Sequence, residues 1–352
     1  MRSMLDTTTL EGKEKKAWTA VFVGFIVILS AVTIEIMNLN YDSLARYPYY
    51  QDENSRALIR RYLNEEEIEY IIEYSIAPNM FIAYIQEDGF SIYHAAEYKK
   101  LSESQWDKSP AMIVKMVEET RGIMTTDELA ELLKPGNYTY DDVSKWMKEE
   151  RDQGIQLLPY AFNSDAYLDA THSVSTRRPA LQYLNEDIPT RDGKPIEVIE
   201  TLQQPLTSLC GGITSPYASQ RACAGLVIES GYISYNEQKR IYDSSLASHG
   251  DSAAFYTSPP GHDEHQLGLC VDFAVEGLSQ SDFDKTWQSA WLHANAWKYG
   301  FAETWTVDDT SLTNHISEPW HYRYVGTELA KTIHDSGLSF ARYKAQTKQN
   351  PG

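Results

Sequence analysis

The longest apolar stretch of this chain lies close to its N-terminus. Residues 18–34 form a run of 17 residues without a charged side chain, which follows Lys13, Lys15 and Lys16 and ends at Glu35. Its length is at the short limit for a membrane span and also suits the apolar core of a signal peptide. Because we find no clear small-x-small cleavage site, we favour an uncleaved signal anchor, and a buried core helix is the least favoured interpretation. The three lysines predict a cytoplasmic N-terminus and an exported remainder.

Helical periodicity begins after a polar, tyrosine-rich segment at 35–60, which we interpret as a tether. Capping-box patterns at 64–67 and 125–128 each open a stretch whose apolar residues have helical spacing. A turn and a second short helical pattern follow each of them, which indicates a weak repeat of helix pairs over 61–175. The pattern favours a packed helical spacer over a region that binds a partner or the cell wall.

The C-terminal half mixes strand and helix patterns. A buried strand is predicted at 224–230 and a helix at 235–246. A second helix is predicted at 283–299, with tryptophans on one face and Gly300 as its stop. These elements fit an α+β fold, in which an antiparallel sheet is flanked by helices on one side.

Two short C-terminal segments concentrate imidazoles and carboxylates. Residues 261–272 read Gly-His-Asp-Glu-His-Gln-Leu-Gly-Leu-Cys-Val-Asp, and residues 318–325 read Glu-Pro-Trp-His-Tyr-Arg-Tyr-Val. A catalytic zinc takes three such protein ligands and leaves a fourth position for water, whereas a structural zinc is usually enclosed by cysteines. The three cysteines of the chain are widely scattered, which disfavours an enclosed cysteine site.

The spacing of His265 and Asp272 requires a break in the backbone between them. They lie seven residues apart, so an unbroken strand would send their side chains to opposite faces of a sheet. Gly268 is the natural place for the break, with His265 on a loop before it and a strand at 269–273 that delivers Asp272.

In the second segment, aromatic residues alternate with His321 and Arg323, which predicts a strand with these two side chains on one face. A fully extended step from Glu318 to His321 would cover roughly 10 Å, too far for Glu318 to reach a water on a zinc held by His321. We therefore expect the chain to turn at Pro319, and we interpret Glu318 as a general base and not as a ligand.

These two segments, together with Ser-Gly-Tyr-Ile-Ser-Tyr-Asn-Glu-Gln at 230–238, closely resemble the three ordered motifs of the VanY-type D-alanyl-D-alanine carboxypeptidases. That family is grouped with lysostaphin-like peptidases and the hedgehog signalling domain, and the resemblance covers about 202–326. It implies Zn²⁺ held by His265, Asp272 and His321, with Glu318 as the catalytic base.

Two positions depart from the family's motifs. Ile233 stands where the family usually has an arginine that receives the terminal carboxylate of the substrate, and Asp263 stands where it usually has a serine. Arg323 is our candidate for a substitute cation, because a guanidinium can pair with a carboxylate through two hydrogen bonds. Gln238, Asp263 and Arg323 are thus the candidate substrate-binding residues.

The resemblance implies zinc-dependent hydrolysis of peptidoglycan stem peptides, with removal of a terminal D-alanine as the favoured reaction. Ile233 keeps open an endopeptidase that cuts an internal bond with the same chemistry. A non-catalytic zinc-containing binding module is a third hypothesis, which the presence of Glu318 disfavours.

Composition adds the remaining expectations. The formal net charge of −19 disfavours nucleic acid as a partner, because phosphates require a basic surface. Cys210 and Cys223 can form a disulfide if they face an oxidising compartment, and Cys270 is interpreted as a small buried residue and not as a ligand.

The sequence predicts five divisions of the chain. They are a cytoplasmic tail at 1–17, a transmembrane signal anchor at 18–34, a tether at 35–60, a helical spacer or interaction region at 61–175 and a zinc peptidase domain at 176–345. We expect a single-pass protein of the cell membrane with its catalytic domain outside the cytoplasm.

Overall fold

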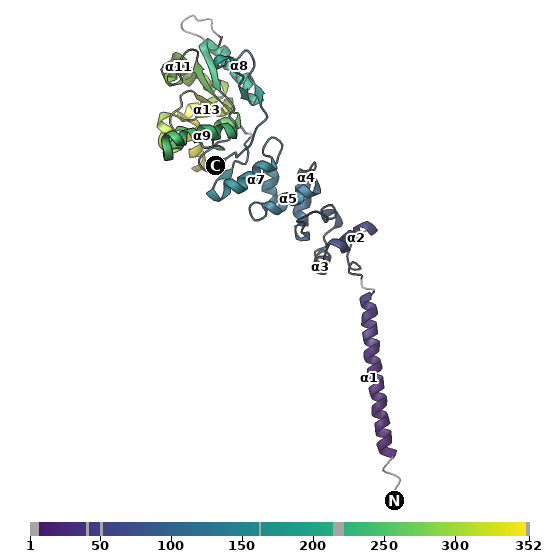
Figure 1. The fold of residues 1–352 in the computed structure, drawn as a ribbon. Helices are drawn as coiled ribbons and strands as arrows, with labels where there is room; N and C mark the ends of the chain where they lie inside the picture. The colour runs from purple at the N-terminus through teal and green to yellow at the C-terminus, as the bar shows by residue number, and fades with distance from the viewer. Residues whose placement is uncertain (1–6, 40–41, 50–51, 162, 214–221, 350–352) are drawn as a thin grey trace. The chain divides into compact units, whose positions relative to one another are not determined.

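The computed structural model describes residues 7–39, 42–49, 52–161, 163–213 and 222–349 (Figure 1). The chain divides into two compact units, Met1–Glu119 and Thr120–Gly352, and each is described here by itself. The sequence placed the start of the peptidase domain at 176, so the second unit also holds part of the predicted helical region. The functional division of the chain stays a prediction.

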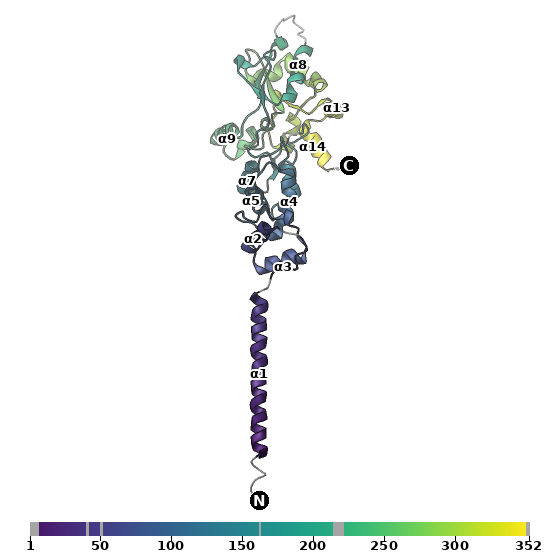
Figure 2. The same ribbon diagram turned by 90° about the vertical axis from the view of Figure 1, so that its right-hand side faces the viewer.

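The first unit begins with a single long helix, α1 (Thr7–Leu39), which Figures 1 and 2 show without a break. Within it, Lys15–Glu35 is long and apolar enough to cross a membrane, and none of it is buried by the rest of the protein. Such an N-terminal helix can serve as a membrane anchor or as a signal sequence.

Short helices form the rest of the first unit. The capping box predicted at 64–67 is present, because the side chain of Asn64 accepts from the amide of Glu67 and the side chain of Glu67 accepts in return. Leu44 and Ile59 pack into the core of this unit, so part of the segment interpreted as a tether belongs to a folded body. The helices are α2 (Glu53–Tyr62), α3 (Glu65–Glu73), α4 (Ala95–Ser104) and α5 (Pro110–Thr120), with 3-10 turns at Pro78–Met80 and Ile92–His94.

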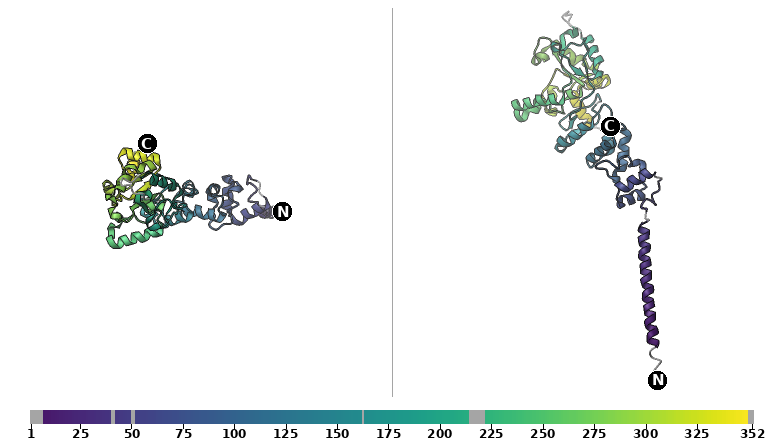
Figure 3. Two further views of the ribbon diagram at one scale, coloured as in Figure 1. Left: turned by 90° about the horizontal axis from the view of Figure 1, so that it is seen from above. Right: turned by 45° about the vertical axis from the view of Figure 1, so that its right-hand side comes forward.

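The second unit is built around a four-stranded antiparallel sheet. Its strands are β5 (Leu226–Ser230), β6 (Cys270–Val275), β7 (Phe301–Glu303) and β8 (His321–Tyr324), in the order β5-β6-β8-β7. Figure 3 shows this unit, coloured teal to yellow, from two further sides. Two-stranded pairs join β1 (Gln156–Leu157) to β2 (His172–Ser173) and β3 (Gln182–Tyr183) to β4 (Glu197–Val198).

The second unit combines this sheet with helices, so the α+β fold class is confirmed. The helices of the unit are α6 (Thr126–Leu132), α7 (Tyr140–Glu149), α8 (Gln203–Gly212), α9 (Tyr235–His249), α10 (Ala253–Tyr256), α11 (Trp287–Asn295), α12 (Thr310–Thr313), α13 (Thr327–Ser336) and α14 (Phe340–Gln349).

The helix predicted at 283–299 is divided into three pieces. A 3-10 segment, Gln280–Lys285, comes first, α11 follows, and a 3-10 turn, Ala296–Tyr299, ends at Gly300 with a φ of +89°. Thr286 has an extended backbone and accepts a hydrogen bond from the amide of Ser289, so it caps a new helix. The prediction of one continuous helix was therefore wrong, whereas the stop at Gly300 was correct.

A disulfide joins Cys210, in α8, to Cys223, with their Cα atoms 4.3 Å apart. The covalent link connects α8 to the turn that leads into β5. The sequence had left this pairing open.

Candidate metal centre

Neighbouring strands bring two of the three predicted ligands together. In the antiparallel pair β6 and β8, Asp272 lies directly opposite His321, and Cys270 lies opposite Arg323. Directly opposed residues project from the same face of a sheet. The sheet therefore presents a carboxylate and an imidazole side by side.

His265 reaches the same place from a 3-10 turn, η8 (Glu264–Leu267), which precedes β6. The turn begins at Asp263, whose Oδ1 accepts a hydrogen bond of 2.9 Å from the amide of His265. It ends at Gly268, where φ is +71° and an added Cβ would lie 2.9 Å from a methyl carbon of Ile199. The predicted break at Gly268 is thus confirmed, since this backbone conformation strongly favours glycine.

One carboxylate oxygen lies close to a ring nitrogen of each histidine. Asp272 Oδ1 lies 3.3 Å from His265 Nε2 and 3.1 Å from His321 Nδ1. Tetrahedral zinc has bonds of about 2.0–2.1 Å to nitrogen and oxygen, which separates neighbouring ligand atoms by roughly 3.3–3.4 Å. The spacing and the chemistry of this donor set therefore fit a zinc ion.

A thiol also lies beside the two imidazoles. The ligand atoms of His265, Cys270 and His321 all lie within 4.8 Å of one another, and the Cys270 side chain is buried and free of any disulfide. The sequence interpretation of Cys270 as a small buried residue is compatible with this position but did not foresee its closeness to both imidazoles.

Each predicted ligand has a second contact that fixes its orientation. His265 Nδ1 donates to the carbonyl oxygen of Gly231 at 2.5 Å, which leaves Nε2 with its lone pair toward the centre. Ser230 Oγ donates to Asp272 Oδ2 at 2.6 Å, and Oδ1 faces the imidazoles. Contacts of this kind commonly orient metal ligands. Ser230 and Gly231, the first two residues of the motif at 230–238, thus hold Asp272 and His265 in place.

His321 is oriented by a buried carboxylate that the sequence analysis did not single out. Its Nε2 lies 3.1 Å from Glu264 Oε2, and both side chains are fully buried. Burial acts to raise the pKa of Glu264, but Arg323 and His321 hold that pKa below its usual value. Only the position of Glu264 next to His265 in the sequence could have drawn attention to it.

Glu318 stands beside the centre and is not part of the converging donor set. His321 N donates to Glu318 O at 3.0 Å, so the chain turns at Pro319 as predicted. Glu318 Oε2 lies 4.0 Å from His321 Nδ1. Burial, with a smaller contribution from nearby Asp272, raises the pKa of Glu318 to about 8 in the metal-free protein. A cation bound nearby would lower that pKa again.

Aromatic rings pack against one side of the centre. The Trp305 ring lies 4.5 Å from the ring of His321 and stacks on His315 at 4.4 Å. Burial lowers the pKa of His315, whose Nδ1 donates to the carbonyl of Ile316. His315 therefore lies near the centre, and Trp305 was missed because an isolated tryptophan carries no spacing signal.

The three substrate-binding candidates are all buried. Gln238 donates to the carbonyl of Ser258 at 2.7 Å, and Asp263 is engaged with the η8 turn. Arg323 is 0% exposed and donates to the carbonyl of Ala166 at 2.9 Å. The predicted common face of His321 and Arg323 is correct, but the guanidinium points into the protein, where it reaches no solvent.

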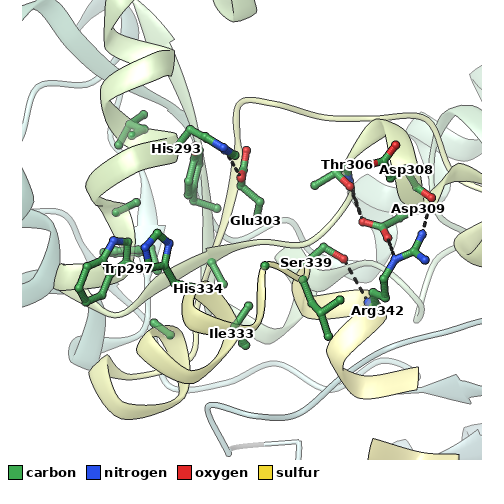
Figure 4. A pocket seen from close by; sticks show the side chains of 18 of the residues that line it. His293, Trp297, Glu303, Thr306, Asp308, Asp309, Ile333, His334, Ser339 and Arg342 are labelled. Carbon is green, nitrogen blue, oxygen red and sulfur yellow. Dashed lines mark hydrogen bonds and ion pairs between the residues drawn. The ribbon is translucent and has the colours of Figure 1, made fainter. Parts of the chain in front are cut away.

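A separate pocket of about 890 Å³ lies on the β7 side of the second unit and is shown in Figure 4. Its lining includes Tyr322, whose position in β8 alternates with that of His321, so it faces the other side of the sheet. His293 pairs with Glu303 on one side of this pocket, and Asp309 pairs with Arg342 on another. The predicted ligands take no part in it.

Comparison with known proteins supports the sequence resemblance. Residues 217–327 match the family model VanY: D-alanyl-D-alanine carboxypeptidase. A D-alanyl-D-alanine carboxypeptidase of Enterococcus faecalis is 36% identical over 129 residues, which are 33% of this chain and 46% of that protein. One of Enterococcus faecium is 32% identical over 123 residues, 35% of this chain and 37% of that protein. The match therefore spans less than half of these relatives.

Solved structures give a partial match. The LD-carboxypeptidase LdcB is 26% identical, covers 55% of this chain and 90% of its own, and aligns with a TM-score of 0.49. A variant of the vancomycin-resistance D,D-pentapeptidase VanY, solved with Zn(II), is 26% identical, covers 51% of this chain and 98% of its own, and aligns with a TM-score of 0.42.

Proposed function

Because residues 217–327 match the VanY family of D-alanyl-D-alanine carboxypeptidases, we propose that this chain is a zinc-dependent peptidase that trims peptidoglycan stem peptides. The favoured reaction is removal of a terminal D-alanine. The observation that carries the proposal is the convergence of His265, Asp272 and His321, with the carboxylate of Glu318 beside them.

In the proposed site, His265 Nε2, Asp272 Oδ1 and His321 Nδ1 would hold the zinc. Bound zinc would lower the pKa of a coordinated water to near 7 and polarise the scissile carbonyl. Glu318 takes the proton from the attacking water and later passes it to the leaving amine. Its position, partly buried and 4.0 Å from a ligand nitrogen, supports this role.

Recognition of the substrate is the point at which an alternative remains. Ile233 supplies no cation, and the guanidinium of Arg323 is enclosed among backbone carbonyls and Glu264. These two observations are the basis of the alternative, an endopeptidase, because that reaction needs no partner for a terminal carboxylate. Gln238 and Asp263 remain the candidates for contacts to the substrate in either reaction.

We place the catalytic unit outside the cell membrane, held by α1 as a single-pass anchor. Three lysines precede the apolar run, which favours a cytoplasmic N-terminus. The Cys210–Cys223 disulfide supports the same orientation, since such bonds persist in oxidising compartments outside the cytosol. Peptidoglycan lies on that side.

Digestion of defined muropeptides tests the proposal. The full chain in detergent would be incubated with pentapeptide and tetrapeptide muropeptides, with and without a chelator, and the products identified by mass spectrometry. Chelator-sensitive release of free alanine supports the carboxypeptidase, and larger fragments support the endopeptidase. Full zinc loading without any hydrolysis would contradict both and favour the binding module.

A further inference from the structure

Glu264 contacts the ring nitrogen of His321 that faces away from the proposed zinc position. In an imidazole that binds a metal through Nδ1, the single ring proton sits on Nε2, so His321 Nε2 would donate to the carboxylate of Glu264 at 3.1 Å. This assignment leaves the lone pair on Nδ1, the atom that lies 3.1 Å from Asp272 Oδ1. The contact thus determines both which nitrogen faces the centre and how the ring is turned.

Two further side chains hold Glu264 in place. Thr304 Oγ1 donates to Glu264 Oε2 at 2.7 Å, the same oxygen that receives His321. Arg323 Nη1 lies 3.6 Å from the other oxygen, Oε1, and compensates its charge. Glu264, Thr304, His321 and Arg323 are all 0% exposed. Bulk solvent therefore does not reach any of these contacts.

The network also explains why Arg323 points inward. It lies two residues after His321 on the same face of β8, and its Nη2 donates to the carbonyls of Ser164 and Ala166. One strand thus supplies a ligand and also the cation that balances the carboxylate orienting this ligand. Burying that carboxylate without a counter-ion would cost several kcal/mol.

We propose that Glu264 is a positioning residue that fixes His321 with Nδ1 toward the zinc, and that Arg323 and Thr304 hold Glu264 in that role. The inference rests on the proposed function in so far as it needs His321 to bind the metal. Its chemistry is the carboxylate–histidine contact that commonly orients metal ligands, and loss of such a contact typically weakens metal binding about 10- to 100-fold.

Two double variants separate positioning from packing. Both contain Arg323→Met, so that no buried cation is left unpaired when Glu264 is replaced. Glu264→Gln keeps an acceptor oxygen for His321 Nε2, whereas Glu264→Leu removes it. Glu303→Gln is the matched control, because it alters a second carboxylate–histidine pair, with His293, on the other side of the sheet.

The readouts are the zinc dissociation constant of the full chain, by competition with a chromophoric chelator, and the thermal midpoint of the metal-free protein. We expect the Leu/Met variant to bind zinc about 10- to 100-fold more weakly than the Gln/Met variant. We expect similar thermal midpoints for the two, and an unchanged zinc affinity for the control. Equal zinc affinities of the two double variants would overturn the proposal, and so would an equal loss in the control.

A third variant keeps the test decisive if the Leu/Met protein does not fold. Glu264→Asp retains the charge beside Arg323 but withdraws the carboxylate by one methylene. Weaker zinc binding by this variant supports the positioning role, and unchanged binding contradicts it. A wild-type chain that binds zinc but hydrolyses no muropeptide would contradict the proposed function alone, and one that binds no zinc would contradict both.

Discussion

At the scale of single residues, the sequence indicated the converging side chains but not the contacts behind them. His265, Asp272 and His321 have the chemistry of zinc ligands. In the structure, Asp272 Oδ1 lies 3.3 Å from His265 Nε2 and 3.1 Å from His321 Nδ1. The role of Glu264 could not be predicted, because spacing does not say which side chain meets the far nitrogen of a histidine. Arg323 was placed on the correct face, but nothing in its own segment indicated that residues 164–166 would enclose it.

The assignment of Glu318 as a base and not a ligand leads to a prediction at this scale. Glu318→Gln should retain zinc, because the converging donors are untouched, and should lose about 10²- to 10⁴-fold in turnover, as expected for removal of a general base. Metal analysis and single-turnover hydrolysis of a muropeptide would measure the two effects. Loss of zinc from this variant would make Glu318 a ligand.

At the scale of elements, the sequence predicted backbone breaks and turns correctly where a single glycine or proline determines the local conformation. The break at Gly268 and the turn at Pro319 were predicted from residue types whose backbone preferences are strong. The segment 283–299 was wrongly predicted as one helix because apolar spacing continues across Thr286. The capping hydrogen bond of that residue restarts the helix, and hydrophobic periodicity does not reveal it.

The disulfide that ties α8 to the turn before β5 should stabilise the second unit. A cross-link that closes a loop of about this length contributes roughly 3 kcal/mol, mainly by restricting the unfolded chain. We expect the double variant Cys210→Ser, Cys223→Ser to unfold at a lower denaturant concentration while keeping its zinc. Wild-type protein unfolded with a reductant present is the control and should match the variant. An unchanged unfolding midpoint would contradict the expectation.

Attachment of α14 should weaken in acid. Burial acts to raise the pKa of Asp309, but hydrogen bonds from Ser339, Thr306 and Arg342 hold it below its ordinary value of 3.8. A carboxyl whose pKa is lower in the folded state stabilises the fold above its unfolded pKa and loses this contribution as the pH falls through the folded pKa. The pairing of Asp309 with Arg342, in α14, is visible in Figure 4.

Asp309→Asn should therefore be less stable than the wild type at pH 7, and the difference should shrink as the pH falls below about 3.8. Denaturant unfolding at several pH values would measure it. Asp192→Asn, which alters an exposed carboxylate, is the control and should show little difference at any pH. A wild-type advantage over Asp309→Asn that does not change with pH would contradict this account.

At the scale of the whole molecule, the sequence separated an apolar N-terminal helix from a catalytic region but could not place the compact division. That division falls between residues 119 and 120 and depends on which residues pack together in the folded chain, which local sequence patterns do not reveal. Capping boxes at Asn64 and Thr125 look alike in sequence, yet they belong to different units.

The proposed orientation in the membrane can be tested in cells whose cell wall has been removed and whose membrane is intact. If α1 is a retained anchor with an exported catalytic unit, added protease should degrade the region after residue 42 and spare the N-terminal tail. Replacing Lys13, Lys15 and Lys16 with glutamine should weaken this preference, since basic residues next to a span set its orientation. Protection of the catalytic unit from protease would contradict export.

The most direct test of the account is the zinc content of the purified chain after dialysis, measured by mass spectrometry for the wild type and two variants. Asp272→Asn removes a proposed ligand, and Cys270→Ala removes the neighbouring thiol as a matched control. We predict one zinc per chain in the wild type and in Cys270→Ala, and almost none in Asp272→Asn. A wild type without zinc, or an Asp272→Asn variant that keeps it while Cys270→Ala loses it, would contradict the proposed centre.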